Sequence, residues 1–294
     1  MTTALLEDLG LPRAPEPLPR PAVDSHTHAD TTREYTRLDL RQNLAAARSV
    51  GITRIVQIGC DVEGSRWAEQ AARATPGVIA AVALHPNDAA RLGDDLDVHI
   101  DQIAELAGAG EHVRAIGETG LDYYRTTDPA LQELQHHSFE RHIEIAKQHD
   151  LTLVIHDRDA HADVLKVLDR VGVPERVIMH CFSGDADFAR ECLDRGAWLS
   201  FPGVVTFGTA GALREALAVT PVERLLVETD APFLTPKPER GKKNAPYLLP
   251  HTIRFIAEQR GFELAEFCDQ LVTNTFAAYA GEWQESQAGE GDDE

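Results

Sequence analysis

Cysteine is scarce in this sequence, and no two cysteines have the spacing of a metal-binding or redox motif. The four cysteines are Cys60, Cys181, Cys192 and Cys268 in a chain of 294 residues. This usage is typical of reduced thiols in a cytosolic protein and not of a disulfide framework. The N-terminus lacks a basic and then apolar signal pattern, and no apolar run approaches the roughly 18 residues of a membrane span. We therefore expect a cytoplasmic protein that does not bind membranes.

Positive charge is also in short supply. Lysine and arginine number 28 against 48 aspartates and glutamates, which gives a formal net charge of −20. Sequence-independent affinity for a long nucleic acid comes from lysine and arginine side chains that neutralise phosphates. The composition therefore argues against a protein that coats nucleic acid. It remains compatible with an enzyme that grips one or two phosphates locally with metal ions.

Short apolar runs alternate with amphipathic segments along most of the chain. The amphipathic segments include Leu38–Val50, Ala130–His149 and Ala160–Val171. The pattern predicts an α/β protein with a single (β/α)8 TIM barrel, because a doubly wound sheet would use only five or six of the runs. The predicted strands are Ala22–His28, Ile52–Gly59, Val78–His85, Val113–Leu121, Leu151–His156, Arg176–Phe182, Trp198–Pro202 and Leu225–Asp230.

The two ends of the chain differ from this pattern. Residues 1–21 form a Pro-rich lead-in with five prolines from Pro12 to Pro21, which we expect to be extended and poorly ordered. Residues 22–280 form the barrel, with Leu248–Arg260 and Glu263–Ala280 as its closing helices. Residues 281–294 are polar and acidic, and we expect a disordered tail.

Histidine, glutamate and aspartate, which are common metal ligands, stand at the ends of the predicted strands. Parallel strands direct their carboxyl ends toward one crevice, and alternation places both histidines of an HxH pair on one side of a strand. A carboxylate can bridge two cations, and two ions about 3.5–4 Å apart can clamp a phosphoryl displacement. We expect two divalent ions, Zn, Mn or Mg, at the carboxyl ends of the strands, although isolated surface histidines are the simpler alternative for any single motif. The candidate ligands are His26, His28, Glu118, His156, His180 and Asp230.

Glu228 and Asp230 share one face of the eighth predicted strand. One of them could hold a metal while the other orients water or a ligand. A salt bridge behind the ligands is the alternative role for Glu228. The candidate catalytic residues are Glu118, Asp230 and Glu228.

Three further residues are candidates for binding the substrate. His85 ends the third predicted strand, and we expect it to contact a phosphate or a leaving group unless it is a core histidine bonded to backbone. Arg240, beside Lys242 and Lys243, follows the eighth strand, where barrels often build phosphate sites. A solvated charged loop is the alternative there. Tyr124 follows the fourth strand and could stack on a base.

An ordered series of motifs resembles the TatD family of metal-dependent deoxyribonucleases, which belongs to the amidohydrolase-like barrels. The resemblance implies that His26, His28, Glu118 and Asp230 hold one metal, and that Glu118, His156 and His180 hold the other. The chain departs from the family pattern in its added lead-in and in Asp157, where a small or neutral residue is usual. The motifs are His26-x-His28, Leu84-His-Pro86, Gly117-Glu-Thr-Gly-Leu-Asp-Tyr123, His156-x-Arg158-x-Ala160, His180-Cys-Phe-Ser-Gly184, Glu228-Thr-Asp-Ala-Pro-Phe233 and Arg240-Gly-Lys-Lys-Asn244.

The favoured function is a two-metal hydrolase that cleaves phosphodiester bonds of DNA from single-stranded or frayed ends, with no obligate protein partner. An amidohydrolase-type ester or amide hydrolase, such as a D-aminoacyl-tRNA deacylase, is the alternative. Many amidohydrolases bridge their metals with a carbamylated lysine on the fourth strand, whereas this strand carries Glu118 and no lysine. A non-catalytic metal-binding scaffold would not explain why His85, Glu228 and Arg240 are expected at the same face.

Overall fold

The computed structural model describes residues 3–287, and its strands form one parallel sheet. Each strand pairs with the next one along the chain, in the order β1 to β8. The predicted single (β/α)8 barrel is therefore confirmed. The strands are β1 (Ala22–Thr27), β2 (Ile52–Ile58), β3 (Val78–Val82), β4 (Val113–Asp122), β5 (Thr152–Arg158), β6 (Val177–Met179), β7 (Trp198–Phe201) and β8 (Leu225–Val227).

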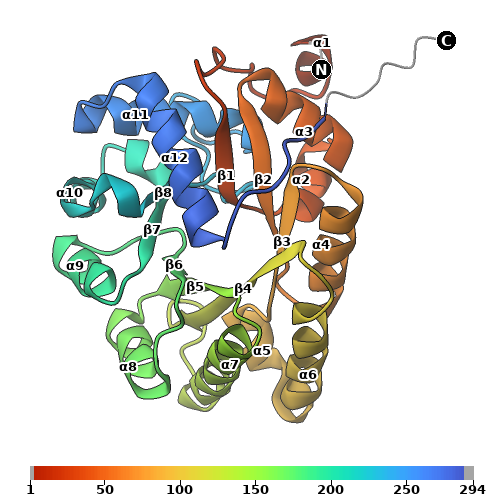
Figure 1. Cartoon of the computed structure of the whole chain (residues 1–294), viewed down its shortest axis with the longest axis vertical. Coiled ribbons are helices and arrows are strands. Elements are labelled where there is room, and N and C mark those ends of the chain that lie inside the picture. The colour runs from red at the N-terminus through yellow and green to blue at the C-terminus, as the bar shows by residue number, and fades with distance from the viewer. Residues whose placement is uncertain (1–2, 288–294) are drawn as a thin grey trace.

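Helices surround the strands on the outside (Figure 1). None of the helices within residues 3–287 is long and apolar enough to cross a membrane. The α-helices are α1 (Thr3–Asp8), α2 (Ala29–Thr36), α3 (Leu40–Ser49), α4 (Val62–Ala74), α5 (Pro86–Leu92), α6 (Leu96–Ala107), α7 (Pro129–Gln148), α8 (His161–Val171), α9 (Ala186–Asp194), α10 (Gly211–Val219), α11 (Leu249–Arg260) and α12 (Leu264–Ala278). Short 3-10 turns are η1 (Gly93–Asp95), η2 (Gly203–Thr206), η3 (Val222–Arg224) and η4 (Pro246–Leu248).

The last and first strands meet at their carboxyl ends. The N–H of Asp230 donates to the carbonyl of His26 at 3.0 Å, and the N–H of His28 donates to the carbonyl of Ala231 at 3.0 Å. These bonds lie beyond the end of β8, so they join the segment that carries Asp230 directly to the segment that carries the two histidines. The closure of the barrel thus brings the candidate ligands of β1 and β8 together.

Alternate strand residues fill the inside of the barrel with apolar side chains. Val154 of β5 and Ile178 of β6 belong to this buried inner cluster. His156 follows Val154 by two residues, and His180 follows Ile178 by two. Because side chains alternate between the two faces of a strand, both histidines point to the inside of the barrel. The phenol of Tyr279 donates to the carbonyl of Ser25 at 2.9 Å within the same cluster. The interior is therefore apolar along most of the length of the strands, and the candidate metal ligands stand at their carboxyl ends.

Aspartates begin several of the outer helices. Asp39, Asp61, Asp128 and Asp185 each accept a hydrogen bond from a backbone N–H in the first turn of α3, α4, α7 and α9. Such a cap satisfies a donor that the helix itself leaves unpaired and typically stabilises the fold by about 1 kcal/mol. Since α4, α7 and α9 directly follow strands, these caps help to fix the loops at the carboxyl ends of the strands.

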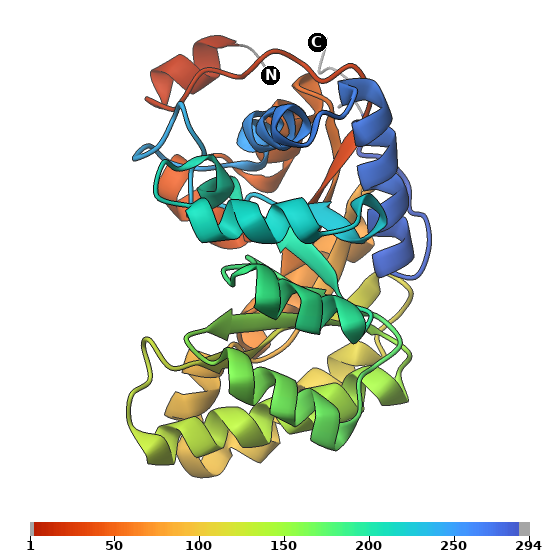
Figure 2. The same cartoon turned by 90° about the vertical axis from the view of Figure 1, so that its left-hand side faces the viewer.

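The Pro-rich lead-in contains α1 and then an extended segment that packs on the barrel, which differs from the extended and poorly ordered lead-in expected for residues 1–21. Leu11 and Leu18 are buried, and the N–H of Leu18 donates to the carbonyl of Val50 at 3.0 Å. The carbonyl of Pro12 accepts the phenol of Tyr247 at 2.9 Å. Figure 2 shows the segment crossing over α11. The two leucines explain the difference, because burying them offsets the entropy of ordering a proline-rich chain that is already restricted.

Residues 281–287 contact the barrel, which differs from the disorder expected for them. The N–H of Ser286 donates to the carbonyl of Thr53 at 2.9 Å, and the carbonyl of Trp283 accepts Arg54 Nε at 2.8 Å. The indole of Trp283 packs edge-on against Tyr279, with ring centroids 6.4 Å apart. An apolar ring among polar residues thus attaches 281–287 to the barrel, while 288–294 lie outside the described residues.

Gly120 in β4 provides a test of how closely β4 and β5 approach. Its φ is 142°, and a Cβ at this position would lie 2.0 Å from the carbonyl oxygen of His156. We expect Gly120→Ala to lower the free energy of unfolding by at least about 2 kcal/mol, because strained φ and overpacking each cost about 1–3 kcal/mol. Urea unfolding measures the change. Gly211→Ala is the control, since its Cβ would meet nothing within 4 Å. Equal stability of the two variants would contradict the close approach.

Candidate metal centre

The six predicted ligands come together at the carboxyl end of the barrel, although they are spread over more than 200 residues of sequence. His26 lies in β1 and His28 immediately follows it, while Glu118 lies in β4 and His156 in β5. His180 and Asp230 stand just beyond β6 and β8. Three groups of residues hold possible ligand atoms within 4.8 Å of one another, and each belongs to this cluster. The groups are His26, His180 and Asp230; His26, His28 and Glu118; and His85, Glu118 and His156.

Glu118 lies at the centre, and its two oxygens face different histidines. Oε1 is 3.4 Å from His28 Nε2 and 3.9 Å from His26 Nε2. Oε2 is 2.7 Å from His180 Nε2 and 3.2 Å from His156 Nδ1. A carboxylate with one pair of imidazoles on each oxygen has the arrangement of a ligand that can be shared by two cations.

Asp230 completes the first of these two sides. Its Oδ1 lies 3.4 Å from His28 Nε2 and 3.8 Å from His26 Nε2. The imidazoles of His26 and His180 stack with centroids 3.8 Å apart, so the two sides of Glu118 are in direct contact. His26, His28, Glu118 and Asp230 therefore form one group of donors that could surround an ion.

Several of these buried nitrogens have no hydrogen-bond partner. Both ring nitrogens of His26 and both of His180 lack one, although the two side chains are almost fully buried. His180 Nε2 is near Glu118, but the geometry makes no hydrogen bond. Buried polar groups in native proteins are nearly always satisfied, and leaving one unpaired costs about 1–3 kcal/mol. Nitrogen lone pairs converging beside carboxylates fit bound divalent cations.

The charges within the cluster are strongly coupled. Burial alone would raise the pKa of Glu118, but His180 and His156 together outweigh burial and hold that pKa well below its usual range. Burial lowers the pKa of His26 well below its usual range, and the neighbouring His180 adds to this shift. Burial lowers the pKa of His28, but Asp230 and Glu118 outweigh burial and raise it to about 9. The carboxylates of Glu118 and Glu228 likewise hold the pKa of His180 well above its usual range. The cluster thus pairs an ionised carboxylate with imidazoles that carry protons, and cations bound there would replace these protons.

Carboxylates lie behind two of the histidines. Glu228 Oε1 lies 3.3 Å from His180 Nδ1 and accepts the N–H of Cys181 at 2.8 Å. The carboxylate of Asp122 lies 3.4 Å from His156 Nε2. Histidines that bind metals usually donate their second ring nitrogen in this manner. Because Glu228 is fully buried behind His180, the structure favours the salt-bridge alternative for this residue over contact with reacting atoms.

Sequence reasoning missed two residues of this outer layer. Asp122 lies in β4, four residues after Glu118. Its carboxylate also accepts a hydrogen bond from Asn87 Nδ2 at 2.8 Å. Cys60 Sγ is 3.4 Å from Glu118 Oε1 and 3.7 Å from His28 Nδ1. Both could have been found by the rule that identified the ligands, since each stands at the carboxyl end of a predicted strand.

His85 reaches the cluster from the start of α5. Its ring lies edge-on to His156, with centroids 4.5 Å apart, and its Nδ1 accepts the N–H of Asn87 at 3.1 Å. Burial, with a contribution from His156, lowers the pKa of His85 to about 3. The ring is therefore neutral near pH 7. Because Nδ1 accepts a hydrogen bond, the single ring proton is on Nε2, which can act as a donor.

The structure places Tyr124 and Arg240 on the loops around the cluster. The guanidinium carbon of Arg158 lies 3.9 Å from the ring centre of Tyr124, which is 61% exposed. The guanidinium carbon of Arg240 lies 4.3 Å from the ring centre of Phe207, on the loop after β7. Within residues 3–287, Arg240 makes no ion pair or hydrogen bond with a candidate ligand. Lys242 pairs with Glu239 at 2.5 Å, which agrees with the solvated alternative for this lysine.

Asp157 does not add a carboxylate to the cluster. Its Oδ2 lies 2.7 Å from His161 Nδ1, and its Oδ1 accepts the N–H of Ala160 at 3.2 Å. Alternation along β5 turns this side chain away from the face of His156. The departure from the family pattern therefore affects the start of α8 and not the ligands.

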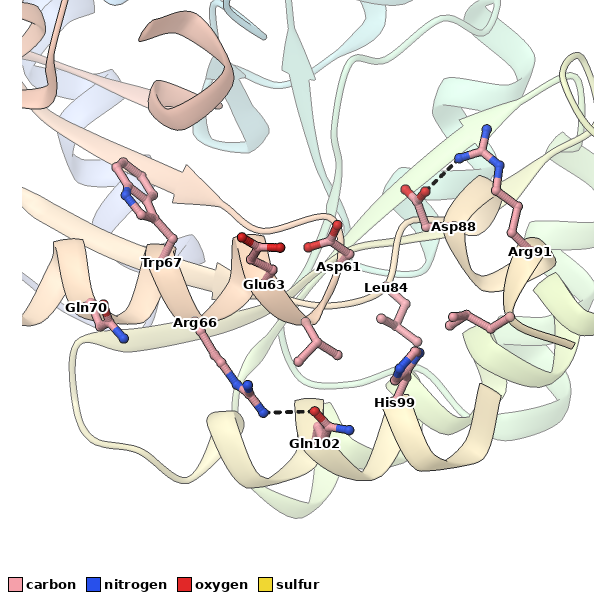
Figure 3. A pocket seen from close by; sticks show the side chains of 12 residues that line it. Asp61, Glu63, Arg66, Trp67, Gln70, Leu84, Asp88, Arg91, His99 and Gln102 are labelled. Atoms are coloured by element: carbon pink, nitrogen blue, oxygen red, sulfur yellow. Dashed lines mark hydrogen bonds and ion pairs between the residues drawn. The ribbon is translucent and has the colours of Figure 1, made fainter. Parts of the chain in front are cut away.

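A cavity of about 680 Å³ lies between α4, α5 and α6 (Figure 3). Its lining includes Trp67, Leu84 and Leu92. Arg66 of α4 pairs with Gln102 of α6 at 2.9 Å, and Asp88 pairs with Arg91 within α5 at 2.8 Å. None of the predicted site residues lines it. The cavity thus lies among the outer helices and is separate from the ligand cluster.

Comparison with known sequences places the chain among metal-dependent hydrolases. It is 42% identical over 264 residues to an uncharacterized metal-dependent hydrolase TatD of Mycobacterium tuberculosis, which covers 89% of this chain and 98% of that protein. It is 36% identical over 230 residues to a protein of Cronobacter sakazakii named 3'-5' ssDNA/RNA exonuclease TatD, covering 76% of this chain and 85% of that protein.

Comparison with solved structures and with a family model agrees with these relatives. A TatD homolog from Escherichia coli k12, YJJV, superposes with a TM-score of 0.79 at 25% identity, covering 89% of this chain and 98% of that one. The model of the family described as TatD related DNase matches residues 23–280. These residues contain all eight strands except the first residue of β1, and every candidate ligand. The chain therefore belongs to the TatD family of metal-dependent hydrolases.

Proposed function

We propose that this protein hydrolyses phosphodiester bonds of DNA, removing nucleotides from single-stranded or frayed ends. The observation that carries the proposal is the position of Glu118, whose two oxygens each face a separate pair of histidines. Such a carboxylate suits a centre of two ions. The name of the Cronobacter sakazakii relative, an ssDNA/RNA exonuclease, supports the substrate.

The proposed centre holds two divalent ions, with Zn, Mn or Mg as candidates. His26, His28, Glu118 and Asp230 would hold one ion, and Glu118, His156 and His180 the other. Imidazole and carboxylate donors together suit Zn or Mn, while Mg is accepted where phosphate oxygens complete the shell. When bound, a pair of ions acidifies a water and stabilises the charge that develops on a phosphate.

The remaining residues would orient the substrate and the ligands. The Nε2–H of His85 is available to donate to a phosphate oxygen beside His156. Arg240 can grip a phosphate with its planar guanidinium, which Phe207 holds flat. Glu228 would position His180 and would not touch the substrate.

A deacylase is less well supported than a nuclease. The carbamylated lysine that bridges the metals of many amidohydrolases has no counterpart on β4, which carries Glu118 and no lysine. A chain with a net charge of −20 also has little positive potential with which to hold a folded tRNA. A cytoplasmic location and the absence of an obligate protein partner belong to the same proposal.

Removing the metals is expected to abolish hydrolysis and lower the melting temperature. A ligand that binds only the folded state stabilises it by mass action. Chelation followed by differential scanning calorimetry and elemental analysis measures both effects. Glu118→Gln is expected to lose both ions, whereas Arg66→Gln on α4 keeps them. Full activity with fewer than one metal ion per chain would contradict the proposal.

Arg240→Ala is expected to weaken binding of single-stranded DNA without changing the metal content. The loss of a charged hydrogen bond typically costs about 1.5–3 kcal/mol. Fluorescence anisotropy with a labelled oligonucleotide measures the affinity, and Lys242→Ala is the matched control because Lys242 pairs with Glu239. If the two variants bind equally well, the loop is a solvated surface.

The affinity for single-stranded DNA is expected to depend only weakly on salt. A plot of log K against log salt should have a slope of about −2 to −3, which corresponds to three or four phosphate contacts on a single strand. Titrations of the metal-loaded protein at several salt concentrations with a single-stranded phosphorothioate oligonucleotide, which resists hydrolysis, measure it. A much steeper slope, or faster cleavage of D-aminoacyl-tRNA than of single-stranded DNA with the same metal, favours the deacylase.

A further inference from the structure

Exposed aromatic side chains lie around the carboxyl ends of the strands. In the described part of the chain, the exposed aromatic residues are Tyr35, Tyr124 and Phe233, with exposed fractions of 48%, 61% and 46%. Tyr35 lies in α2 after β1, Tyr124 follows β4, and Phe233 follows β8. Aromatic rings exposed to water cost free energy unless a ligand covers them, and these three are found on the face that carries the metal ligands.

Each exposed ring is held by a neighbour. Tyr124 lies beneath the guanidinium of Arg158 at 3.9 Å. Tyr35 and Phe233 make an edge-to-face pair, with centroids 6.1 Å apart and planes at 73°. Such pairs fix the orientation of a ring without covering its outer face, as the exposed fractions show. Rings and guanidinium planes presented in this manner are the surfaces on which unpaired nucleobases stack.

The two pairs stand on opposite sides of the barrel. The strand order β1 to β8 places the β4–β5 edge across from the β8–β1 edge. Tyr124 and Arg158 follow β4 and end β5, whereas Tyr35 and Phe233 follow β1 and β8. Because the candidate ligands come from the ends of these same strands and from β6, and converge around Glu118, a chain that bridges the two pairs passes over the ligand cluster.

The charge of the protein favours stacking as the source of affinity. A net charge of −20 gives little general attraction for phosphates, whereas stacking on an aromatic ring does not depend on phosphate charge. Stacking also requires free base faces, which a duplex does not present. The aromatic pairs therefore provide a physical reason for a single-stranded substrate.

We propose that single-stranded nucleic acid lies across the mouth of the barrel with one base on the Tyr124–Arg158 pair and another on the Tyr35–Phe233 pair. The stretch of backbone between these two bases then carries its phosphates over the ligand cluster. The inference rests on the proposed nuclease function and adds the two base subsites that select an unpaired strand.

The experiment uses two matched oligonucleotides with the full-length protein. One is ordinary single-stranded DNA, and the other has abasic tetrahydrofuran units in place of the nucleotides on both sides of the first cleaved phosphate. Tyr124→Ala and Phe233→Ala are each expected to raise the KM for ordinary DNA by about 5- to 150-fold, the range for one stacked base. Phe233→Trp restores it, because the ring is retained. Val98→Ala, which changes an exposed apolar residue on α6, leaves it unchanged.

The abasic oligonucleotide separates stacking from a general defect. The wild-type protein is expected to show a raised KM for this substrate, and the alanine variants are expected to add no further increase. Metal content and melting temperature should be the same in all variants. A KM of the Tyr124→Ala and Phe233→Ala variants equal to that of Val98→Ala overturns the inference while the nuclease function stands. If the wild-type protein cleaves neither single-stranded DNA nor RNA, the proposed function fails as well.

Discussion

A buried carboxylate surrounded by four imidazoles is the interaction on which the rest of the site depends. An ionised Glu118 in the interior costs several kcal/mol unless neighbouring charges or bound cations compensate. Its oxygens lie within 4 Å of four histidines that come from three different segments of chain. The ends of the strands must therefore be positioned to within a fraction of an ångström. The close approach of β4 and β5 at Gly120 helps to position them, and so do the carboxylates that lie behind His156 and His180.

Much of the fold and most of the ligand set could be predicted from the sequence. Each strand is a short apolar run, and parallel strands end at one face, so residues such as His156 and His180 could be located without a structure. The position of Glu228 could not, because β8 ends at Val227 and Asp230 has a φ of 52°, so strand alternation no longer applies. The backbone hydrogen bond from Leu18 to Val50 could not be predicted either, because a contact between residues distant in sequence leaves no local pattern.

An acidic protein that acts on an acidic polymer must confine its attraction to a small region. Here the net charge is −20, and the groups suited to nucleic acid lie on the loops that surround the ligand cluster. Arg158 and Arg240 are each paired with an aromatic ring, which orients the guanidinium and removes part of its freedom before a ligand arrives. This arrangement favours local contacts with one or two nucleotides over a grip on a long strand.

Electron paramagnetic resonance of the Mn²⁺-loaded protein tests most directly whether Glu118 joins two metal ions. Two Mn²⁺ ions that share a carboxylate are spin-coupled, so the account predicts a coupled spectrum at two ions per chain. In the Glu118→Gln variant this coupling should disappear, while Glu228→Gln should keep it because Glu228 lies behind His180 and does not face Glu118 directly. A spectrum of isolated Mn²⁺ ions in the fully loaded wild-type protein would contradict the account.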